Sequence, residues 1–344
     1  MRVLIDILHP AHVHFFRNFH SVMEERGHEL CITARDKDRS VDLLRQYDLP
    51  YQQISVQKSG GVGMVVEMTQ RTGALMKVMG QFKPDVMTGI MGPSIALAGA
   101  LLRVPVAVFY DTEFAVQTNR FVYPLATSVC TPDCYQGRIR GRNPRYAGYH
   151  ELAYLHPNRF QPDPAALTAF GVSPDEPYSI VRFVSWQAVH DRRERGLTAK
   201  QKRYLVEVLQ RHGRVLISSE EPLTSDLADL AVRGPVDQIH HLIAFARLVV
   251  GESATMSSEA AVLGVPAVFI ATTGRGYTDD QERRYGLVRH FTDDQYDKAL
   301  SAIDETLTDS ADRWQAARQF LLKEKIDVTA WMIDYFETSF GRAE

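Results

Sequence analysis

The 344-residue sequence predicts an α/β protein of two Rossmann-like domains, each a doubly wound parallel sheet, facing a central cleft. Its length exceeds what one hydrophobic core usually serves. Strand and helix patterns alternate in two series, and the stretch between them, residues 137–175, is irregular and dense in proline, glycine and arginine. Repeated strand–helix–strand units imply right-handed crossovers and parallel sheets.

In the first series, short apolar runs with β-branched residues indicate strands that are buried on both faces. Residues 3–8 form the first run, and residues 15–26 follow as a helix that ends at Gly27. The other elements predicted here are strands at 30–34, 51–56, 85–90 and 106–110, helices at 39–47 and 95–102, and a long amphipathic segment that follows Gly63 and runs to about residue 82.

The second series repeats the pattern after residue 175. Its predicted elements are strands at 178–183, 215–218, 248–251 and 267–270, helices at 199–211 and 257–263, and helical segments at 312–336. We therefore expect one domain at residues 1–165, a second at 166–320, and a C-terminal helix at 321–344 that packs back across the domains.

Composition and charge narrow the classes of protein. The formal net charge of −3 gives no reason to expect a nucleic-acid partner. Three cysteines are too few for a disulfide framework, so reduced thiols in the cytoplasm are expected. The N-terminus runs directly into a strand, and the most apolar stretch, residues 95–110, is interrupted by Arg103 and Pro105. Neither a signal peptide nor a membrane span is predicted.

A cluster of arginines lies in the irregular stretch between the two series. Its members are Arg138, Arg140, Arg142 and Arg145. A solvated surface is one interpretation. The alternative is peripheral contact with an anionic lipid surface, or with a phosphorylated acceptor.

Parallel sheets bind ligands at the carboxyl ends of their strands, so the loops after strands are the expected places for chemistry. Three histidines follow the first strand, and imidazole accepts protons near neutral pH. We take His14 as the first candidate for the catalytic base and His12 as the second. The alternative is that some of the three histidines are structural, capping the helix or packing against Phe15 and Phe16. No carboxylate or histidine stands at a metal-ligand spacing, so no metal is expected.

Two further loops of the first half carry candidates. Gly92 allows a tight turn or close approach to a ligand, and Ser94 can bind substrate or cap a helix. Asp111 and Glu113 follow an apolar strand and are candidate catalytic carboxylates. Helix capping is the alternative for both.

The most specific pattern lies at residues 249–268, which read as a strand, a small polar loop, a helix and another strand. Backbone amides at the helix start can bind a phosphate, and Glu259 can reach the hydroxyls of a ribose. Four hydroxyl residues accompany it as candidate substrate-binding groups: Ser253, Thr255, Ser257 and Ser258. The alternative is a capped helix whose dipole Glu259 complements.

Other loops of the second half contribute further substrate-binding candidates. Arg275 can offset phosphate charge, while Asp280 and Gln281 can bind sugar hydroxyls. Ser185 can donate to a diphosphate and Trp186 can stack on a ring, although a half-buried tryptophan without a ligand is the common alternative. Ser218 and Ser219 can flank a nucleotide base.

The run Ser258-Glu-Ala-Ala-Val-Leu-Gly-Val-Pro266 resembles the donor-binding motif of glycosyltransferases with two Rossmann domains, the GT-B fold. That fold is shared by the peptidoglycan UDP-N-acetylglucosamine transferase and the UDP-N-acetylglucosamine 2-epimerases. Residues 6–16, 33–36 and 182–186 resemble an uncharacterised family more closely. This family is domain of unknown function 354, often labelled predicted glycosyltransferase.

The resemblance implies that residues 253–258 bind a diphosphate, Glu259 binds the ribose, and Asp280 and Gln281 bind the donor sugar. It also implies that His14 stands near the position of the base. Two departures matter. The glycine-rich Gly-Gly-x-Gly-His turn of the peptidoglycan enzyme is missing, and the carboxylates of the epimerases are not clearly matched.

We therefore expect a metal-independent glycosyltransferase that needs no cofactor besides its nucleotide-sugar donor, and a UDP-sugar is the expected donor. The second domain would hold the donor, and the first would hold a glycan, lipid or small-molecule acceptor. An epimerase of the same superfamily is one alternative. A non-catalytic protein that binds nucleotide sugars or serves as a scaffold is another.

Overall fold

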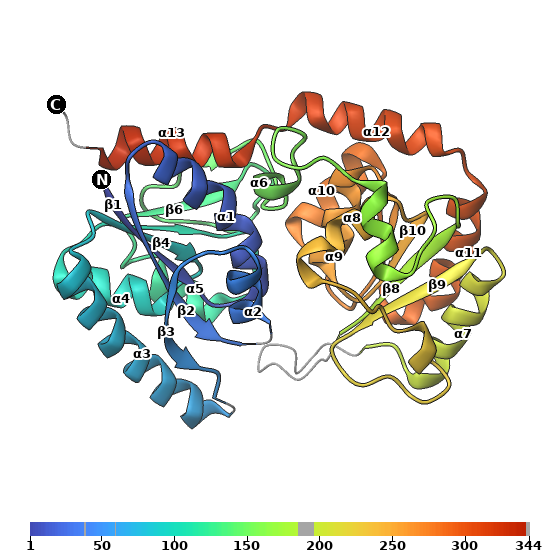
Figure 1. The fold of residues 1–344 in the computed structure, drawn as a ribbon, viewed down its shortest axis with the longest axis horizontal. Helices are drawn as coiled ribbons and strands as arrows, with labels where there is room; N and C mark the ends of the chain where they lie inside the picture. The colour runs from blue at the N-terminus through green and yellow to red at the C-terminus, as the bar shows by residue number, and fades with distance from the viewer. Residues whose placement is uncertain (38, 59, 185–195, 342–344) are drawn as a thin grey trace. The chain divides into compact units, whose positions relative to one another are not determined.

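A computed structural model describes the chain except residues 38, 59, 185–195 and 342–344 (Figure 1). The chain divides into two compact units. Unit 1 comprises Met1–Arg159 and Ile326–Glu344, and unit 2 comprises Phe160–Lys325. The sequence placed the boundaries after residues 165 and 320, and the structure places them after residues 159 and 325. The last helix belongs to unit 1.

Unit 1 is built on a seven-stranded parallel sheet in the order β3-β2-β1-β4-β5-β6-β7. Its strands are β1 (Arg2–Ile7), β2 (Glu29–Asp36), β3 (Tyr51–Val56), β4 (Val86–Ile90), β5 (Val106–Phe109), β6 (Ser128–Pro132) and β7 (Arg145–Tyr146). Its helices are α1 (Pro10–Glu25), α2 (Ser40–Gln46), α3 (Gly61–Phe82), α4 (Pro93–Leu102), α5 (Val116–Val122), α6 (Leu152–Leu155) and α13 (Val328–Phe340).

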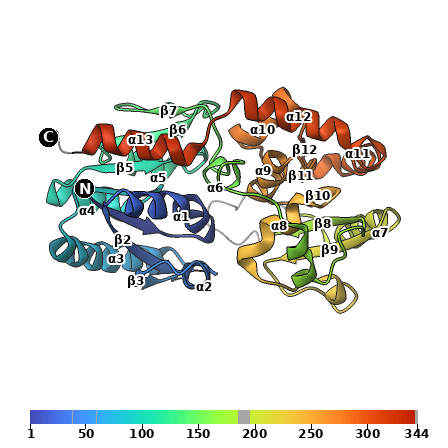
Figure 2. The same ribbon diagram turned by 45° about the horizontal axis from the view of Figure 1, so that its top comes forward.

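Unit 2 has a five-stranded parallel sheet in the order β12-β11-β10-β8-β9, and Figure 2 shows the labelled strands of this unit following one another in that order. Its strands are β8 (Tyr178–Phe183), β9 (Arg214–Ser219), β10 (Leu248–Gly251), β11 (Ala267–Ile270) and β12 (Val288–Phe291). Its helices are α7 (Ala199–Gln210), α8 (Ile239–Ala244), α9 (Ala254–Leu263), α10 (Gly276–Tyr285), α11 (Tyr296–Thr308) and α12 (Ala311–Glu324).

Each sheet is covered by helices because its strands are apolar on both faces. In unit 1, Leu4 of β1 packs with residues of α3 and α4 in one buried cluster. Phe15 and Phe16 of α1 pack against Phe109 of β5, with ring centroids 5.1 and 5.9 Å apart. The two-domain fold with parallel sheets is thus as the sequence predicts. The strands β6, β7 and β12 were not predicted.

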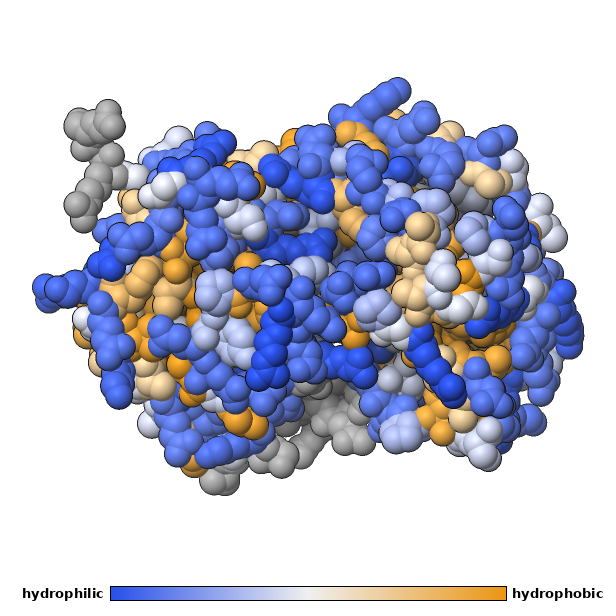
Figure 3. Space-filling model, in the orientation of Figure 1, coloured by the Kyte–Doolittle hydropathy of each residue, from blue (hydrophilic) through white to orange (hydrophobic). Residues whose placement is uncertain are grey.

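The order of strands reverses once in each sheet. In unit 1, β1 lies between β2 and β4, and in unit 2, β8 lies between β9 and β10. Doubly wound sheets bind ligands in the crevice at this point. The loops that leave β1 and β4 flank it in the unit 1 sheet, and those that leave β8 and β10 flank it in the unit 2 sheet. The surface in Figure 3 is largely hydrophilic. Among the described residues, no helix has both the length and the apolar character to span a bilayer.

Candidate functional site

The helix after β1 begins five residues earlier than the sequence predicted. His9 is its N-cap, with Nδ1 accepting a hydrogen bond from the Ala11 amide at 3.2 Å, and Pro10 occupies the first helical position. Proline is pre-organised for that position, so the turn starts there. As a result, His12 and His14 lie on the first turns of α1 rather than in a loop.

His12 is buried, and its Nδ1 accepts a hydrogen bond from the Leu8 amide at 3.3 Å. Its pKa is lowered well below the usual value, chiefly because burial disfavours the charged ring and also because His9 and His150 are nearby. A neutral ring that accepts at Nδ1 carries its proton on Nε2. His12 is therefore arranged to donate a hydrogen bond through Nε2.

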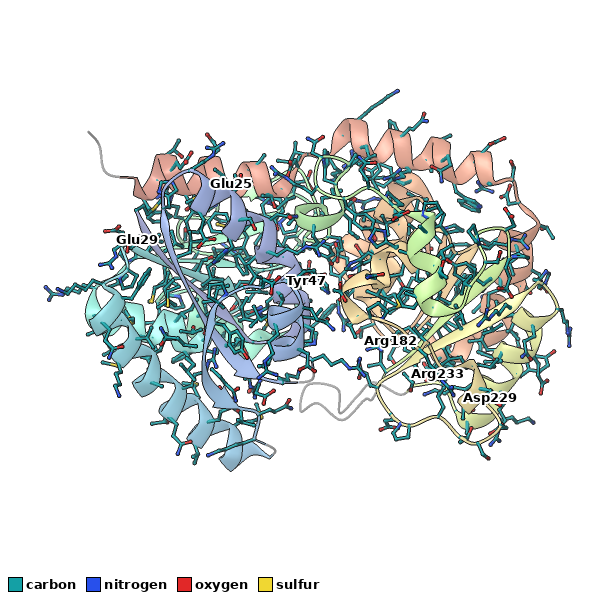
Figure 4. The ribbon with its side chains drawn as sticks, in the orientation of Figure 1. Glu25, Glu29, Tyr47, Arg182, Asp229 and Arg233 are labelled. Atoms are coloured by element: carbon teal, nitrogen blue, oxygen red, sulfur yellow. The ribbon has the colours of Figure 1, made fainter. Side chains whose placement is uncertain are left out.

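His14 has a different environment. Its Nδ1 lies 3.3 Å from the hydroxyl of Tyr47, which Figure 4 labels, and its ring stacks on Tyr154 at a centroid distance of 5.4 Å. His14 thus packs on aromatic side chains, but on Tyr154 and Tyr47 and not on Phe15 and Phe16 as the packing alternative had it. The Tyr47 contact occupies one ring nitrogen.

Asp111 follows β5 and is held at both carboxylate oxygens. Oδ2 lies 3.1 Å from Nδ1 of His150, and Oδ1 accepts a hydrogen bond from the Thr112 hydroxyl at 2.9 Å. Burial alone would raise the pKa of Asp111, but His150, Thr112 and the nearby His12 together lower it. The structure thus brings Asp111, His12 and His150 into one cluster.

The sequence did not indicate His150 as a candidate site residue. It belongs to the irregular stretch before α6, where no strand or helix pattern indicated its position. Glu113, by contrast, turns elsewhere, because its Oε1 accepts a hydrogen bond from the Gln136 amide at 3.1 Å. No contact between Glu113 and the cluster is seen among the described residues.

Gly92 is the N-cap of α4 and has a φ of +51°. A Cβ there would lie 2.6 Å from Cγ1 of Ile95, so glycine is needed for the turn. Ser94 is buried within the first turn. It does not cap the helix, because Gly92 holds that position.

In unit 2, α9 begins directly after β10 and a sharp turn. Ser253 is its N-cap, and its hydroxyl accepts a hydrogen bond from the Met256 amide at 3.2 Å. The Ser257 hydroxyl donates to the Ser253 carbonyl at 2.9 Å, and Thr255 is half-buried in the first turn. The first amides of a helix have no intrahelical acceptor. Because the Ser253 hydroxyl binds the amide of Met256, the amides of Ala254 and Thr255 are the first-turn donors that this cap does not bind.

Two buried polar pairs follow along α9. Oε1 of Glu259 lies 2.9 Å from Nε2 of His240 on α8. The Ser258 hydroxyl accepts a hydrogen bond from Nε2 of Gln281 on α10 at 2.7 Å. His240, like His150, was not predicted. These contacts give Ser258 and Gln281 a role in joining α9 to α10.

The other predicted residues near α10 also contact the fold. Asp280 is buried, with Oδ2 3.6 Å from Nζ of buried Lys325 and Oδ1 3.0 Å from Nη2 of Arg283. The Arg275 guanidinium donates to the hydroxyl of Thr273 at 2.8 Å and to the Gly274 carbonyl at 3.0 Å.

At the ends of β8 and β9, Arg182 donates to the Ser218 hydroxyl at 2.9 Å and to Oε1 of Glu220 at 2.6 Å. Figure 4 labels Arg182 at this position. Ser219 is the half-buried last residue of β9. Ser185 and Trp186 lie outside the described residues.

Glu252, which the sequence analysis did not assign, connects β10 to the segment after β8. Its buried carboxylate accepts hydrogen bonds from the amides of Val184 at 3.0 Å and Leu197 at 2.6 Å. Nζ of Lys202 lies 3.4 Å away. Both oxygens of this carboxylate therefore accept hydrogen bonds from backbone amides of the segment that follows β8.

In the described part of the chain, no group of three or more histidine, cysteine, aspartate or glutamate residues could hold a metal ion. A cavity of ≈ 350 Å³ is lined by Arg289, Glu305, Trp314 and their neighbours, and its lining includes no predicted site residue.

A family model described as Protein of unknown function (DUF354) matches residues 1–274. An uncharacterized protein of Methanocaldococcus jannaschii is 22% identical over 279 residues, which cover 77% of this chain and 80% of that protein. The sequence resemblance to this family is thus confirmed.

Several solved structures share the fold. The UDP-GlcNAc 2-epimerase of Methanocaldococcus jannaschii, in complex with UDP-GlcNAc and UDP, aligns with a TM-score of 0.63 and 13% identity over 90% of this chain and 94% of that one. MurG of Acinetobacter baumannii aligns at 0.59 and 17% over 98% and 100%. The glycosyltransferase SsfS6 of Streptomyces sp. SF2575 aligns at 0.60 and 12% over 96% and 99%. The chain therefore has the GT-B fold.

Proposed function

The chain belongs to the DUF354 family of proteins of unknown function, and on that premise we propose that it transfers a sugar from a UDP-linked donor to an acceptor hydroxyl. Unit 2 would bind the donor and unit 1 the acceptor. The acceptor oxygen forms a bond to the anomeric carbon, the bond from that carbon to the diphosphate oxygen breaks, and UDP leaves.

The observation that carries the proposal is the start of α9. This helix begins where the strand order of the unit 2 sheet reverses, which is the position where such sheets bind phosphates. The positive end of the helix dipole lies at the amides of Ala254 and Thr255, so this position favours a negatively charged ligand. Because Ser253 and Ser257 satisfy the helix itself, the amides rather than the hydroxyls are the groups we assign to the diphosphate.

Glu259 lies one turn further along α9 and would accept hydrogen bonds from the ribose hydroxyls. The contact with His240 at Oε1 fixes the direction of the carboxylate. The fold likeness to an epimerase solved with UDP-GlcNAc and UDP supports a UDP-linked donor.

In unit 1, Asp111 and His12 are the groups that we assign to the proton of the acceptor. A carboxylate with a lowered pKa is ionised at neutral pH and can accept that proton as the bond to the sugar forms. His12 would donate a hydrogen bond through Nε2 to the acceptor. His14 and Glu113 are not part of this assignment, because the contacts described for them are with Tyr47 and Gln136 and not with the cluster of Asp111, His12 and His150.

The helix amides would stabilise the negative charge that develops on the leaving diphosphate. In other enzymes a divalent cation stabilises this charge. Because the helix amides would do so here, the proposed transfer needs no metal ion. Activity should then be unchanged after treatment with a chelator such as EDTA. A loss of activity that added Mg²⁺ or Mn²⁺ restores would contradict this part of the proposal.

The donor assignment can be tested by titrating UDP and UDP-GlcNAc into the protein in a calorimeter. We expect Glu259→Gln to keep the His240 contact and to lose about tenfold or more in affinity, because an amide cannot accept from both ribose hydroxyls. Glu305→Gln is the matched control, since Glu305 is exposed and pairs with Arg289 at 2.7 Å outside the candidate site. No binding by the wild-type protein, or equal affinities for wild type and Glu259→Gln, would contradict the assignment.

A second candidate function is that of a UDP-GlcNAc 2-epimerase, which the fold likeness also favours. Incubation with UDP-GlcNAc alone separates the two. A transferase releases UDP in proportion to added acceptor, whereas an epimerase yields a second UDP-sugar with no acceptor present.

A further inference from the structure

A buried histidine contacts the carboxylate that we assign as the proton acceptor. His150 is 7% exposed, and its Nδ1 is 3.1 Å from Oδ2 of Asp111. Its ring is packed among aromatic side chains, with the centroid of Phe15 at 4.5 Å and that of Tyr146 at 6.4 Å. The imidazole therefore has little freedom to rotate away from Asp111.

The second ring nitrogen supports one direction for the hydrogen bond. Nε2 of His150 is buried and has no hydrogen-bond partner among the described residues. A proton on Nε2 would be a buried donor without an acceptor, which is costly. The proton is better placed on Nδ1, where it is donated to Asp111. With the Thr112 hydroxyl on Oδ1, both oxygens of the carboxylate are then oriented.

We propose that His150 is a positioning residue that fixes the carboxylate of Asp111 as the proton acceptor of the reaction. This inference rests on the proposed function. His150 itself does not contact the substrate in this account, because both of its nitrogens are buried or engaged. It differs in this from His12 on α1, whose Nε2 is assigned to the acceptor.

Among the described residues, three titratable groups act on the carboxylate of Asp111. They are His150 before α6, His12 on α1 and Tyr146 on β7, whose pKa is raised chiefly by burial and also by the charge of Asp111. Of these, His150 makes the direct contact with the carboxylate. Its removal should therefore raise the pKa of Asp111 toward the ordinary aspartate range and move the acidic limb of the rate profile to higher pH.

The experiment compares the wild-type protein with His150→Phe and His150→Asn. Phenylalanine keeps an aromatic ring between Phe15 and Tyr146 but removes the donor, while asparagine restores an N–H near the position of Nδ1. Turnover is followed as UDP release from UDP-GlcNAc and a panel of other UDP-sugars, with water or added alcohols as acceptors, from about pH 3 to 9, so that the ordinary aspartate range is covered. The ionisation of Asp111 is followed separately by NMR of protein labelled with carboxyl-¹³C aspartate, with Asp111→Asn used to assign the signal.

We expect His150→Phe to lower kcat/KM about tenfold or more, to leave UDP affinity unchanged, and to raise the pKa of Asp111. His150→Asn should recover most of both. An unchanged pKa and an unchanged acidic limb in His150→Phe would overturn the inference, as would a loss of activity that is equal at every pH and that asparagine does not restore. If the wild-type protein turns over no UDP-sugar, the proposed function fails, and the Asp111 titration still decides whether His150 governs the carboxylate.

Discussion

Gly251 shows how one residue sets the geometry at the start of α9. Its φ is +149°, and a Cβ added there would lie 2.1 Å from the carbonyl oxygen of Arg182 on the neighbouring strand. Only glycine allows β10 to approach β8 this closely just before the chain turns into the helix.

We predict that Gly251→Ala lowers the free energy of unfolding of unit 2 by at least about 2 kcal/mol, because an unfavourable backbone angle and a backbone clash add together. Gly286→Ala is the control. Gly286 has a φ of +64° and open space around it, so only the backbone angle should matter, at about 1 kcal/mol. Urea unfolding that gives equal losses for the two variants would show that the contact with Arg182 is not tight.

A second residue-scale feature is the buried ion pair of Asp6 on β1 with Arg71 on α3. The two side chains are 0% and 3% exposed, and Asp6 also accepts a hydrogen bond from Thr33 at 2.6 Å. Arg71 extends the network by donating to the Ser55 hydroxyl at 2.6 Å.

Removal of one partner leaves the other charge buried without compensation. We predict that Arg71→Met lowers the stability of unit 1 by roughly 3–5 kcal/mol, and that Asp6→Asn combined with Arg71→Met loses less than Arg71→Met alone. A double variant that is as unstable as the sum of the two single variants would contradict this coupling.

At the scale of elements, α1 carries three buried histidines, His12, His14 and His20. Burial lowers the pKa of both His12 and His20, although Glu24 opposes the change at His20. In the unfolded chain each histidine takes up a proton below about pH 6.5. In the folded chain it does so only at a lower pH. The unfolded state therefore binds more protons in this window, and stability falls as the pH decreases through it.

We predict that unit 1 loses stability between pH 7.5 and 5.5, and that a variant with His12→Gln and His20→Gln shows a smaller loss. The lowered pKa of Asp111 acts at lower pH and does not enter this window. Urea unfolding at each pH measures the effect, and the interval from pH 7.5 to 8.5 serves as a control in which both proteins should be equally insensitive. Equal slopes for the two proteins below pH 7.5 would contradict the assignment to these histidines.

The elements also show what local patterns could reveal. The strand β1 is mostly apolar and β10 is a continuous apolar run. The pattern after β10 indicated a helix, but it placed the start at residue 257, whereas α9 begins at Ala254 after its N-cap Ser253. The beginning of α1 was missed because histidine is an unusual N-cap, and proline at the first helical position resembles a turn. His150 and His240 could not be predicted, since each gains its role from a carboxylate that is distant in sequence and near only in the folded chain.

At the scale of the whole molecule, the chain passes from unit 1 to unit 2 and returns to end in unit 1. The last helix, α13, buries Val328, Met332 and Phe336 at a helical spacing, and the ring of Phe336 lies 5.0 Å from that of Phe19 on α1. The alternation of strands and helices predicted two parallel sheets. The sequence also predicted that the C-terminal helix packs back across the domains. Its assignment to unit 1 could not be predicted, because a helical pattern identifies an apolar face and not its partner.

This arrangement predicts which part of the protein each core residue stabilises. Phe336→Ala should lower the melting temperature of the same calorimetric transition as Phe19→Ala, with a loss of about 3–5 kcal/mol. Phe269→Ala in β11 should act on the transition of unit 2 instead. If Phe336→Ala shifts the transition that Phe269→Ala affects, the last helix stabilises unit 2, and its assignment to unit 1 is contradicted.

The central claim is that the start of α9 binds a nucleoside diphosphate. Crystals soaked with UDP test it most directly. We predict difference density for the diphosphate within about 3 Å of the amides of Ala254 and Thr255, with the ribose hydroxyls against Glu259. Density for UDP elsewhere on unit 2, or an empty helix terminus at saturating UDP, would contradict the account.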